Sequence, residues 1–260
     1  MNSQQIEELT NVSAQRRQVI KAMAGGAIPG ALGLSGAVSA RAQATPAAQD
    51  SAGAIKNILC YGDSNTYGQK PIPFEGADGR FAPDVRWTGV LQRELGDGYH
   101  VIEEGLNGRT TIWEDIIEPG HNGKTYFQPC LESHLPLDMV TIMLGTNDLK
   151  ARFDLNPSDI AQSAAYLAAF ARGYAPVVLM MIPPPLTELS MFDVMFEGGI
   201  EKSQQFAEYY PRMAALYGVA NVFDAGSVIV TSPTDGIHFE ADQHAKLGQA
   251  VAEEVRRLIG

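Results

Sequence analysis

Short apolar runs alternate with amphipathic stretches along the chain from Ile55 onward. The runs 138–145 and 176–184 are nearly continuous Val, Met, Ile and Leu, the pattern that a parallel sheet covered on both faces requires. Glycine or proline borders each run. We therefore expect five strands of one parallel sheet, at 56–62, 100–105, 138–145, 176–184 and 220–226.

Stretches with helical periodicity or helix-boundary residues separate these runs. In the stretch 156–173, Pro157 stands at a first-turn position and Gly173 marks the end. Three further stretches predict helices, at 84–95, 198–218 and 240–260. Five strands alternating with helices predict one doubly wound, three-layer α/β domain over residues 55–260.

The first 44 residues have a different composition. The segment QRRQVIK at 15–21 precedes a Gly- and Ala-rich stretch that leads to AQA at 42–44. A basic pair, a weakly apolar stretch and a small-x-small end are typical of an export signal, and paired arginines indicate the twin-arginine route. An uncleaved anchor is the alternative, since about 18 apolar residues can span a bilayer, but the glycines and Pro29 disfavour it. We expect an export signal over 1–44, a linker over 45–54, and a periplasmic or secreted domain without a stable membrane anchor.

Composition narrows the classes of partner. Apolar residues make up 45% of the chain and charged residues 19%, an ordinary globular balance. The formal net charge of −11 argues against nucleic acid or an anionic membrane as a partner. Two cysteines are too few for a disulfide framework, and no Cys/His spacing indicates a metal site. We expect no metal and no cofactor.

Polar segments follow the predicted strands. GDSN at 62–65, EGLNGRTT at 104–111 and LGTNDLK at 144–150 follow the first three, and SPTDGIHFEADQHAKLG at 232–248 follows the last. GDSN alone fits a surface turn, because its residues are turn formers. In a parallel sheet, however, the carboxyl ends of the strands share one edge, so four distant segments converge there. Their convergence predicts an active site.

These segments contain the groups that nucleophilic catalysis requires. A serine hydroxyl becomes a nucleophile when a histidine takes its proton and a carboxylate orients that histidine. Ser64 is the candidate nucleophile, and Asp235 and His238, three residues apart across a glycine turn, are the candidate carboxylate and base. An oxyanion also needs hydrogen-bond donors. The candidates are the backbone N–H groups of Ser64 and Gly108 and the side-chain amide of Asn147.

Other polar residues near these segments have structural interpretations. We expect Asp63 to cap a helix or brace its loop, and Asp148 to cap a helix after the third strand. His244 lies in a helical run without a nearby carboxylate turn, which favours a surface histidine. Arg109 fits a structural ion pair at least as well as a site for a substrate carboxylate.

The four segments together resemble those of the SGNH (GDSL-type) hydrolase superfamily. FAPDVRWTGVL, VIEEGL, HLPLDMVTIMLGTNDLK, MFEGG and VFDAGSV are similar to one branch, the bacterial arylesterases and a mycobacterial acyltransferase/perhydrolase. The resemblance extends from about Ile58 to the C-terminus. It implies a flavodoxin-like sheet and a serine esterase, with Ser64, Asp235 and His238 as the triad and Ser64, Gly108 and Asn147 as the oxyanion hole. Asn65 stands where such enzymes commonly carry Leu, and is expected to alter the pocket floor.

Long apolar loops accompany the predicted site. They either line a substrate pocket or form a subunit interface in a homo-oligomer, and the sequence leaves both open. The candidate pocket residues are Asn65, Trp113, Met191, Phe192, Met195 and Phe196. We expect hydrolysis of short-chain or aryl esters, with acyl transfer to alcohols as a further activity. An exported carbohydrate acetylesterase is the alternative, and a non-catalytic binding module is the non-enzyme alternative.

Overall fold

The computed structural model describes residues 54–260 of the chain. The predicted export signal over 1–44, and the predicted linker up to residue 53, lie outside the described residues. Among residues 54–260, no helix combines the length and the apolar character needed to cross a membrane.

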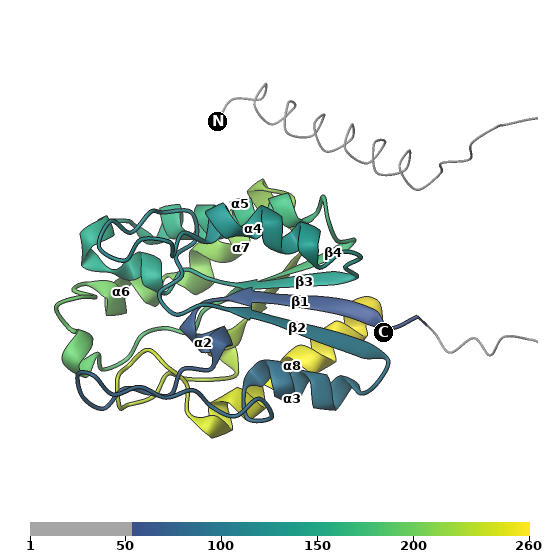
Figure 1. Ribbon diagram of the computed structural model, residues 1–260. Coiled ribbons are helices and arrows are strands. Elements are labelled where there is room, and N and C mark those ends of the chain that lie inside the picture. Colours follow the sequence, from purple (N-terminus) through teal and green to yellow (C-terminus); the bar gives the residue numbers. More distant parts are fainter. Residues whose placement is uncertain (1–53) are drawn as a thin grey trace, which may run out of the picture. The chain divides into compact units, whose positions relative to one another are not determined.

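A five-stranded parallel sheet forms the centre of this domain (Figure 1). Its order is β2-β1-β3-β4-β5, so the chain begins in the sheet interior, moves to one edge, and then crosses back. This reversal between β1 and β3 is the position at which open α/β sheets bind ligands. The five predicted strands are confirmed within two residues at each end: β1 (Lys56–Gly62), β2 (Tyr99–Gly105), β3 (Met139–Met143), β4 (Val177–Ile182) and β5 (Asn221–Asp224).

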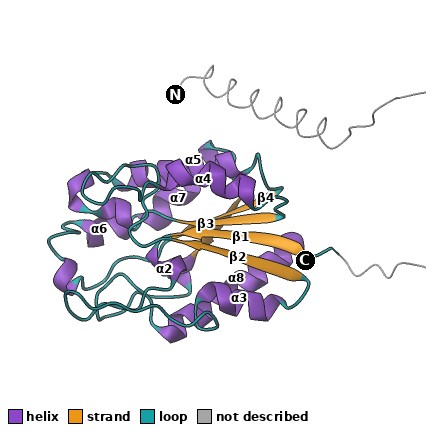
Figure 2. Cartoon of the chain, in the orientation of Figure 1, coloured by secondary structure: helices purple, strands orange, loops and turns teal. Residues whose placement is uncertain are grey.

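Helices cover both faces of the sheet, as the apolar strands require (Figure 2). Alternation along β1 shows the two cores: Ile58 and Cys60 pack on one face, and Leu59 and Tyr61 on the other. The first face is covered by α3 (Trp87–Leu95) and α8 (Ala241–Ile259), and the second by α4 (Gly123–Ser133), α5 (Pro157–Ala171) and α7 (Phe206–Leu216). The predicted three-layer α/β class is confirmed.

The helices depart from the predicted ones in two places. Helix α4 was not predicted; Asn122 begins it by accepting a hydrogen bond from the backbone N–H of Lys124 at 3.0 Å. The predicted helix over 198–218 consists of two helices, α6 (Gly199–Ser203) and α7. A further short helix, α2 (Ser64–Tyr67), follows β1 directly.

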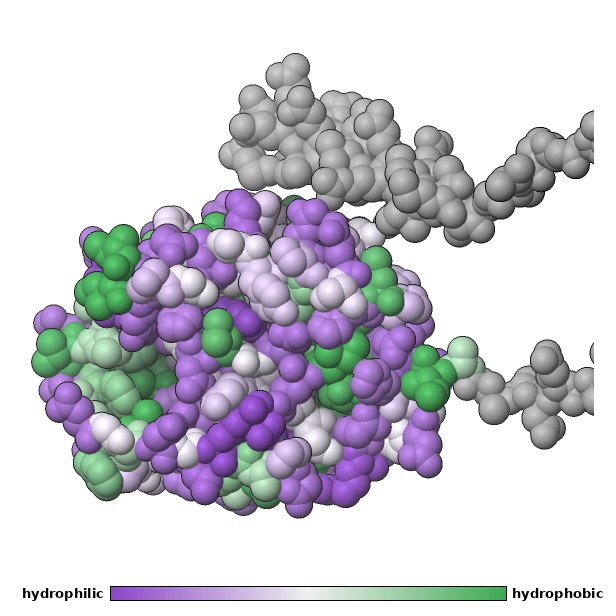
Figure 3. Space-filling model, viewed as in Figure 1, coloured by the Kyte–Doolittle hydropathy of each residue, from purple (hydrophilic) through white to green (hydrophobic). Residues whose placement is uncertain are grey.

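The loops that follow the strands gather at one end of the domain. Figure 2 shows them around the carboxyl ends of β1 and β3, next to α2 and α6. In the space-filling view, apolar side chains gather at this same end, and further apolar patches lie elsewhere on the visible face (Figure 3). The expected convergence of the polar segments is therefore found, together with the apolar loops beside them.

Candidate active site

Ser64 is positioned by the junction between β1 and α2. Asp63 caps α2, since its Oδ1 accepts a hydrogen bond from the backbone N–H of Asn65 at 2.9 Å, as expected from the sequence. Gly62 permits the close approach of the helix, because a Cβ there would lie 2.1 Å from Oγ1 of Thr66. The turn places Ser64 at the floor of a pocket with 6% of its surface exposed.

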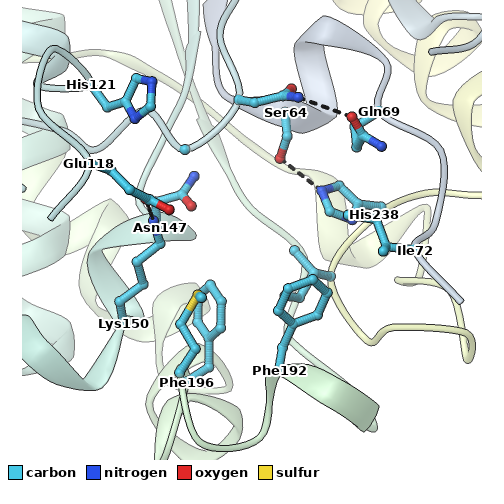
Figure 4. Close-up of a pocket in the computed structure, with 14 residues that line it drawn as sticks. Ser64, Gln69, Ile72, Glu118, His121, Asn147, Lys150, Phe192, Phe196 and His238 are labelled. Atoms are coloured by element: carbon cyan, nitrogen blue, oxygen red, sulfur yellow. Dashed lines mark hydrogen bonds and ion pairs between the residues drawn. The ribbon is translucent and has the colours of Figure 1, made fainter. Parts of the chain in front are cut away.

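A chain of two hydrogen bonds joins Ser64 to the last loop before α8. Ser64 Oγ lies 3.0 Å from His238 Nε2 (Figure 4), and His238 Nδ1 lies 2.7 Å from Asp235 Oδ2. The predicted local pairing of Asp235 with His238 is therefore present. The arrangement allows the imidazole to accept the serine proton while the carboxylate stabilises the resulting imidazolium.

The carboxylate of Asp235 accepts four hydrogen bonds. Its Oδ1 accepts from the backbone N–H groups of Ile237 and His238, and its Oδ2 accepts from that of Ile72 at 2.8 Å as well as from the imidazole. Burial pushes the pKa of Asp235 upward, but the hydrogen bond and the charge of His238, together with the backbone donors, outweigh it and hold this pKa below its usual value. Asp235 is therefore an ionised and immobile partner for the imidazole.

Three hydrogen-bond donors converge beside Ser64. Within residues 54–260, no hydrogen bond occupies the backbone N–H of Ser64 or of Gly108. Gly108 has a φ of +75°, a conformation that glycine adopts at low cost. Asn147 Nδ2 donates to the carbonyl oxygen of Arg109 at 3.2 Å, which leaves its second N–H for the pocket that it lines. Such donors can stabilise an oxyanion that develops on a carbonyl bound at Ser64.

Arg109 and Asp148 fix the loop that contains Gly108. The Arg109 guanidinium donates to the carbonyl oxygens of Gly62 and Glu104 and lies 4.1 Å from the centre of the Tyr61 ring. With 3% of its surface exposed, it is a structural residue rather than a site for a substrate carboxylate. Asp148 Oδ2 accepts from the backbone N–H of Thr111 at 3.0 Å. The expectation that Asp148 caps a helix is therefore wrong; its carboxylate braces the neighbouring loop.

Two carboxyl groups below the pocket lack a cationic partner in contact. Burial raises the pKa of Asp63 to about 6 and that of Asp148 to about 7. Hydrogen bonds offset this only in part: the backbone N–H of Asn65 donates to Asp63, and the hydroxyl and backbone N–H of Thr111 donate to Asp148. The charge of Asp63 contributes further to the shift at Asp148. Both groups are therefore partly protonated near neutral pH.

The pocket above Ser64 has a volume of about 220 Å³. Three of the predicted apolar residues, Phe192, Met195 and Phe196, line it. Polar side chains that the sequence analysis did not identify line the rest: Gln69, Asn107, Glu118, His121 and Lys150. Ile72 and Ile237 complete the apolar part.

The other three predicted pocket residues lie elsewhere. Trp113 is directed to α5, where its Nε1 donates to Ser163 Oγ at 3.2 Å. Asn65 is buried with its amide on the carbonyl oxygen of Ile237, and it braces the histidine loop instead of forming a pocket floor. Met191 is half exposed and lies outside the lining. The prediction that these three residues line the pocket is therefore wrong.

His244 is a core residue, which corrects its interpretation as a surface histidine. It is fully buried between the rings of Phe81 and Phe239, and its Nδ1 accepts the backbone N–H of Trp87 at 3.3 Å. Burial lowers the pKa of His244 to about 4, so this imidazole is neutral and serves packing.

One group of side chains outside the pocket could in principle ligate a metal ion. The ligand atoms of Glu104, Cys130 and His134 lie within 4.8 Å of one another. Glu104 and His134 already bind each other at 2.9 Å, and burial raises the pKa of Cys130 to about 12. A metal needs the thiolate, so this group favours the structural contact between Glu104 and His134 over a metal site.

Comparison with known proteins agrees with this geometry. The model of the GDSL-like lipase/acylhydrolase family matches residues 60–246, a span that includes Ser64, Asp235 and His238. The chain belongs to the GDSL-like lipase/acylhydrolase family. The resemblance inferred from the four sequence segments is therefore confirmed, and the family establishes the chain as a carboxylic ester hydrolase.

Solved structures of GDSL-like hydrolases extend the comparison. The native aryl esterase of M. smegmatis is 47% identical, with a TM-score of 0.75, over 78% of this chain and all of that one. Est24, a carbohydrate acetylesterase from Sinorhizobium meliloti, is 42% identical, with the same TM-score and the same coverage of both chains. A carbohydrate acetylesterase family member from the same organism is 36% identical, with a TM-score of 0.73, over 79% of this chain and all of that one. A search of curated proteins found no significant match.

Proposed function

We propose that the protein hydrolyses short-chain or aryl carboxylic esters through an acyl-enzyme on Ser64. The observation that carries this proposal is the continuous hydrogen-bonded chain from Ser64 Oγ through His238 to Asp235, at 3.0 and 2.7 Å. With the triad whole, a non-catalytic binding module of the same fold is disfavoured.

The reaction follows from these positions. His238 Nε2 takes the proton of Ser64 Oγ as that oxygen attacks the ester carbonyl carbon. The oxygen that gains negative charge is stabilised by the N–H groups of Ser64 and Gly108 and by the Asn147 amide. The imidazolium then gives its proton to the departing alkoxide, and a water activated by His238 releases the acid.

The volume and the lining of the pocket favour small substrates that have an apolar part. A volume of about 220 Å³ suits an aryl ring or a short chain rather than a long lipid. The apolar part formed by Ile72, Phe192 and Phe196 supports an aryl alcohol. The same apolar part of the pocket supports acyl transfer, since a bound alcohol can compete with water for the acyl-enzyme when it is held in attack geometry.

The decisive experiment replaces Ser64 with alanine. Hydrolysis of phenyl acetate should fall by several orders of magnitude, because removing a triad member leaves only a residual advantage of about 10³–10⁴-fold over water. Far-UV circular dichroism checks that the variant is folded. Turnover comparable to that of the wild type would refute the role of Ser64 as nucleophile.

A carbohydrate acetylesterase is the second candidate. The polar lining residues Gln69, Asn107 and Glu118 support it, since they can bind sugar hydroxyls, and two solved relatives have this description. Comparison of kcat/KM for phenyl acetate and acetylated xylan decides between the two candidates. Preference for the xylan by tenfold or more, a threshold of about 1.4 kcal/mol, would favour the second.

We further propose that the enzyme is exported by the twin-arginine route and works in the periplasm or outside the cell. The paired arginines at 16–17 and the AQA segment support this. The double variant Arg16→Lys, Arg17→Lys should accumulate as uncleaved precursor in the cytoplasm. Normal export of that variant would point to a general secretory signal instead.

A homo-oligomer is supported by apolar side chains on loops around the pocket. Ile116 and Val194, each within two residues of a lining residue, have 90% and 79% of their surface exposed, and exposed apolar side chains on loops can mark contacts between chains. Light scattering at several concentrations tests this, and a monomer throughout would refute it.

A further inference from the structure

The pocket has two chemically different sides. Figure 4 places His238 and Ile72 on one side of Ser64, and Glu118 and Lys150 on the opposite side. The first side combines the apolar Ile72 with two uncharged or titratable polar groups, the amide of Gln69 and the imidazole of His238, and carries no ion pair within the lining. The second contains a charged pair whose members come from different loops.

The reaction chemistry assigns a different half of the ester to each side. The departing alcohol oxygen must reach His238 Nε2, because this nitrogen supplies its proton, so the alcohol lies on the side of His238 and Ile72. The carbonyl oxygen points to Gly108 and Asn147. The acyl substituent occupies the remaining direction, away from His238, which leads it to Lys150.

The charges around Lys150 are balanced. Its ammonium binds Glu118 and lies 3.6 Å from Asp115, and Arg152 binds Asp115 at 2.7 Å. Lys150 has only 3% of its surface exposed, and yet it lines the cavity. An ammonium has three donors; Glu118 accepts one, and Asp115 lies beyond hydrogen-bond distance, so a donor remains for a ligand in the pocket. The equal numbers of positive and negative groups favour a neutral acceptor over an anion.

We propose, on the basis of the esterase function above, that the enzyme selects short acyl groups that carry an oxygen acceptor, such as an ether, hydroxyl or keto oxygen, and that Lys150 binds this oxygen. A purely alkyl acyl group would remove water from the ammonium without replacing its hydrogen bond, which is unfavourable. An acceptor oxygen replaces that bond. Lys150 is therefore a specificity-determining residue for the acyl half of the substrate.

The test uses two esters of nearly equal size, phenyl methoxyacetate and phenyl butyrate. They differ by an oxygen in place of a methylene. Each kcat/KM is divided by the rate constant for hydroxide-catalysed hydrolysis of the same ester, which removes the difference in intrinsic reactivity. The wild type should prefer the methoxyacetate by about tenfold or more after this correction, as expected for a hydrogen bond to a charged group.

Two variants locate the source of the preference. Lys150→Met keeps the length of the side chain without its charge, and should bring the corrected ratio close to one. Lys124→Met, at an exposed lysine 5.0 Å from the Tyr166 ring, is the matched control and should keep the wild-type ratio. A wild-type ratio of one or below, or an unchanged ratio in Lys150→Met, would overturn the proposal.

A third variant keeps the proposal testable if Lys150→Met does not fold. Glu118→Gln removes the negative partner, so Lys150 should then accept an anionic acyl group, and kcat/KM for phenyl hemisuccinate should rise several-fold. No rise in a folded variant would count against Lys150 as a ligand for the acyl group. These results are separable from the esterase assignment, which fails only if Ser64→Ala still hydrolyses both esters at the wild-type rate.

Discussion

Two sets of buried carboxyl groups lie near Ser64, and their environments shift their pKa values in opposite directions. Asp235, in the loop before α8, and Asp63 and Asp148, in the loops after β1 and β3, each have 1% or less of their surface exposed. The pKa of Asp235 is lowered, whereas that of Asp63 is raised to about 6 and that of Asp148 to about 7. Burial is common to all three, so the difference lies in their partners: only Asp235 contacts a group that can become a cation.

This contrast separates two uses of a buried carboxylate. Asp235 is placed to stabilise a positive charge on His238, whereas Asp63 and Asp148 accept hydrogen bonds that hold their loops in place, from Asn65 and from Thr111. Loss of the first should therefore affect catalysis, and loss of the second should affect folding and its pH dependence.

The largest effect is expected for Asp235→Asn. An amide has one acceptor oxygen, so in either orientation two of the four donors around Asp235 lose their acceptor, or the imidazole is held in the wrong tautomer. We expect kcat to fall by about 10⁴-fold. Steady-state kinetics with phenyl acetate measure this, and Asp242→Asn, at an exposed carboxylate of α8, is the control. A fall in kcat of less than tenfold would show that Asp235 does not differ from Asp63 and Asp148 in its importance for catalysis.

A smaller effect is expected for Asn147→Ala, next to Asp148. The amide contacts the substrate oxygen only as charge develops on it, so kcat should fall by about 10²–10³-fold with little change in KM. The control is Asn57→Ala, whose amide binds the carbonyl oxygen of Pro136 outside the pocket. A change confined to KM would make Asn147 a substrate-binding group instead.

Asp148→Asn should change the pH dependence of stability. The unfolded carboxyl releases its proton near 3.8 and the folded one near 7, so the folded state holds the extra proton between these values. The contribution of Asp148 to the free energy of unfolding therefore becomes less favourable as pH rises from about 3.8 to about 7. Because Asn resembles the protonated group, the stability of the variant relative to the wild type should rise by about 2 kcal/mol from pH 5 to pH 8.

Urea unfolding at the two pH values measures this difference. The contribution of Asp235 to stability depends on pH in the opposite direction. Because its pKa is lowered in the folded state, this contribution is fully present above the ordinary value of 3.8 and is lost as pH falls through the folded-state pKa. A stability difference for Asp148→Asn that is the same at both pH values would show that Asp148 does not titrate as a buried, unpaired group.

The smallest effect is expected for Asp63→Asn. Asn caps helices as well as Asp does, so the bond to the backbone N–H of Asn65 is retained. The free energy of unfolding at pH 5 should change by less than about 1 kcal/mol, and kcat by less than about threefold. A loss of kcat near that of Asp235→Asn would place Asp63 in the catalytic machinery.

The sequence was sufficient for the sheet and the triad for identifiable reasons. Continuous apolar runs marked the buried strands, and the carboxyl ends of parallel strands necessarily share an edge. Asp235 and His238 were close in sequence, so their pairing needed only a local turn. By contrast, α4 contains Pro129 and has no clear apolar period, and α6 and α7 are separated by a break that their composition does not indicate.

The pocket lining was less predictable because it depends on side-chain direction. Trp113 is apolar and next to the site, but it points to Ser163 of α5. Lys150 is charged, and yet its ion pairs allow it to be buried at the pocket. His244 has no partner nearby in sequence, and it is buried through contacts with Phe81 and Phe239. In each case, contacts with residues distant in sequence determine where the side chain lies.

The contact between Lys56 and the carbonyl oxygen of Ile259 has a practical consequence. It joins the first strand to the last helix at the amino edge of the sheet, and Ser64 lies at the carboxyl edge. A carrier bead or fusion partner attached at residue 260 would therefore leave the mouth of the pocket open to substrate. Because these two ends of the domain are adjacent, a short linker could connect them, and new termini could be opened in a loop distant from the triad.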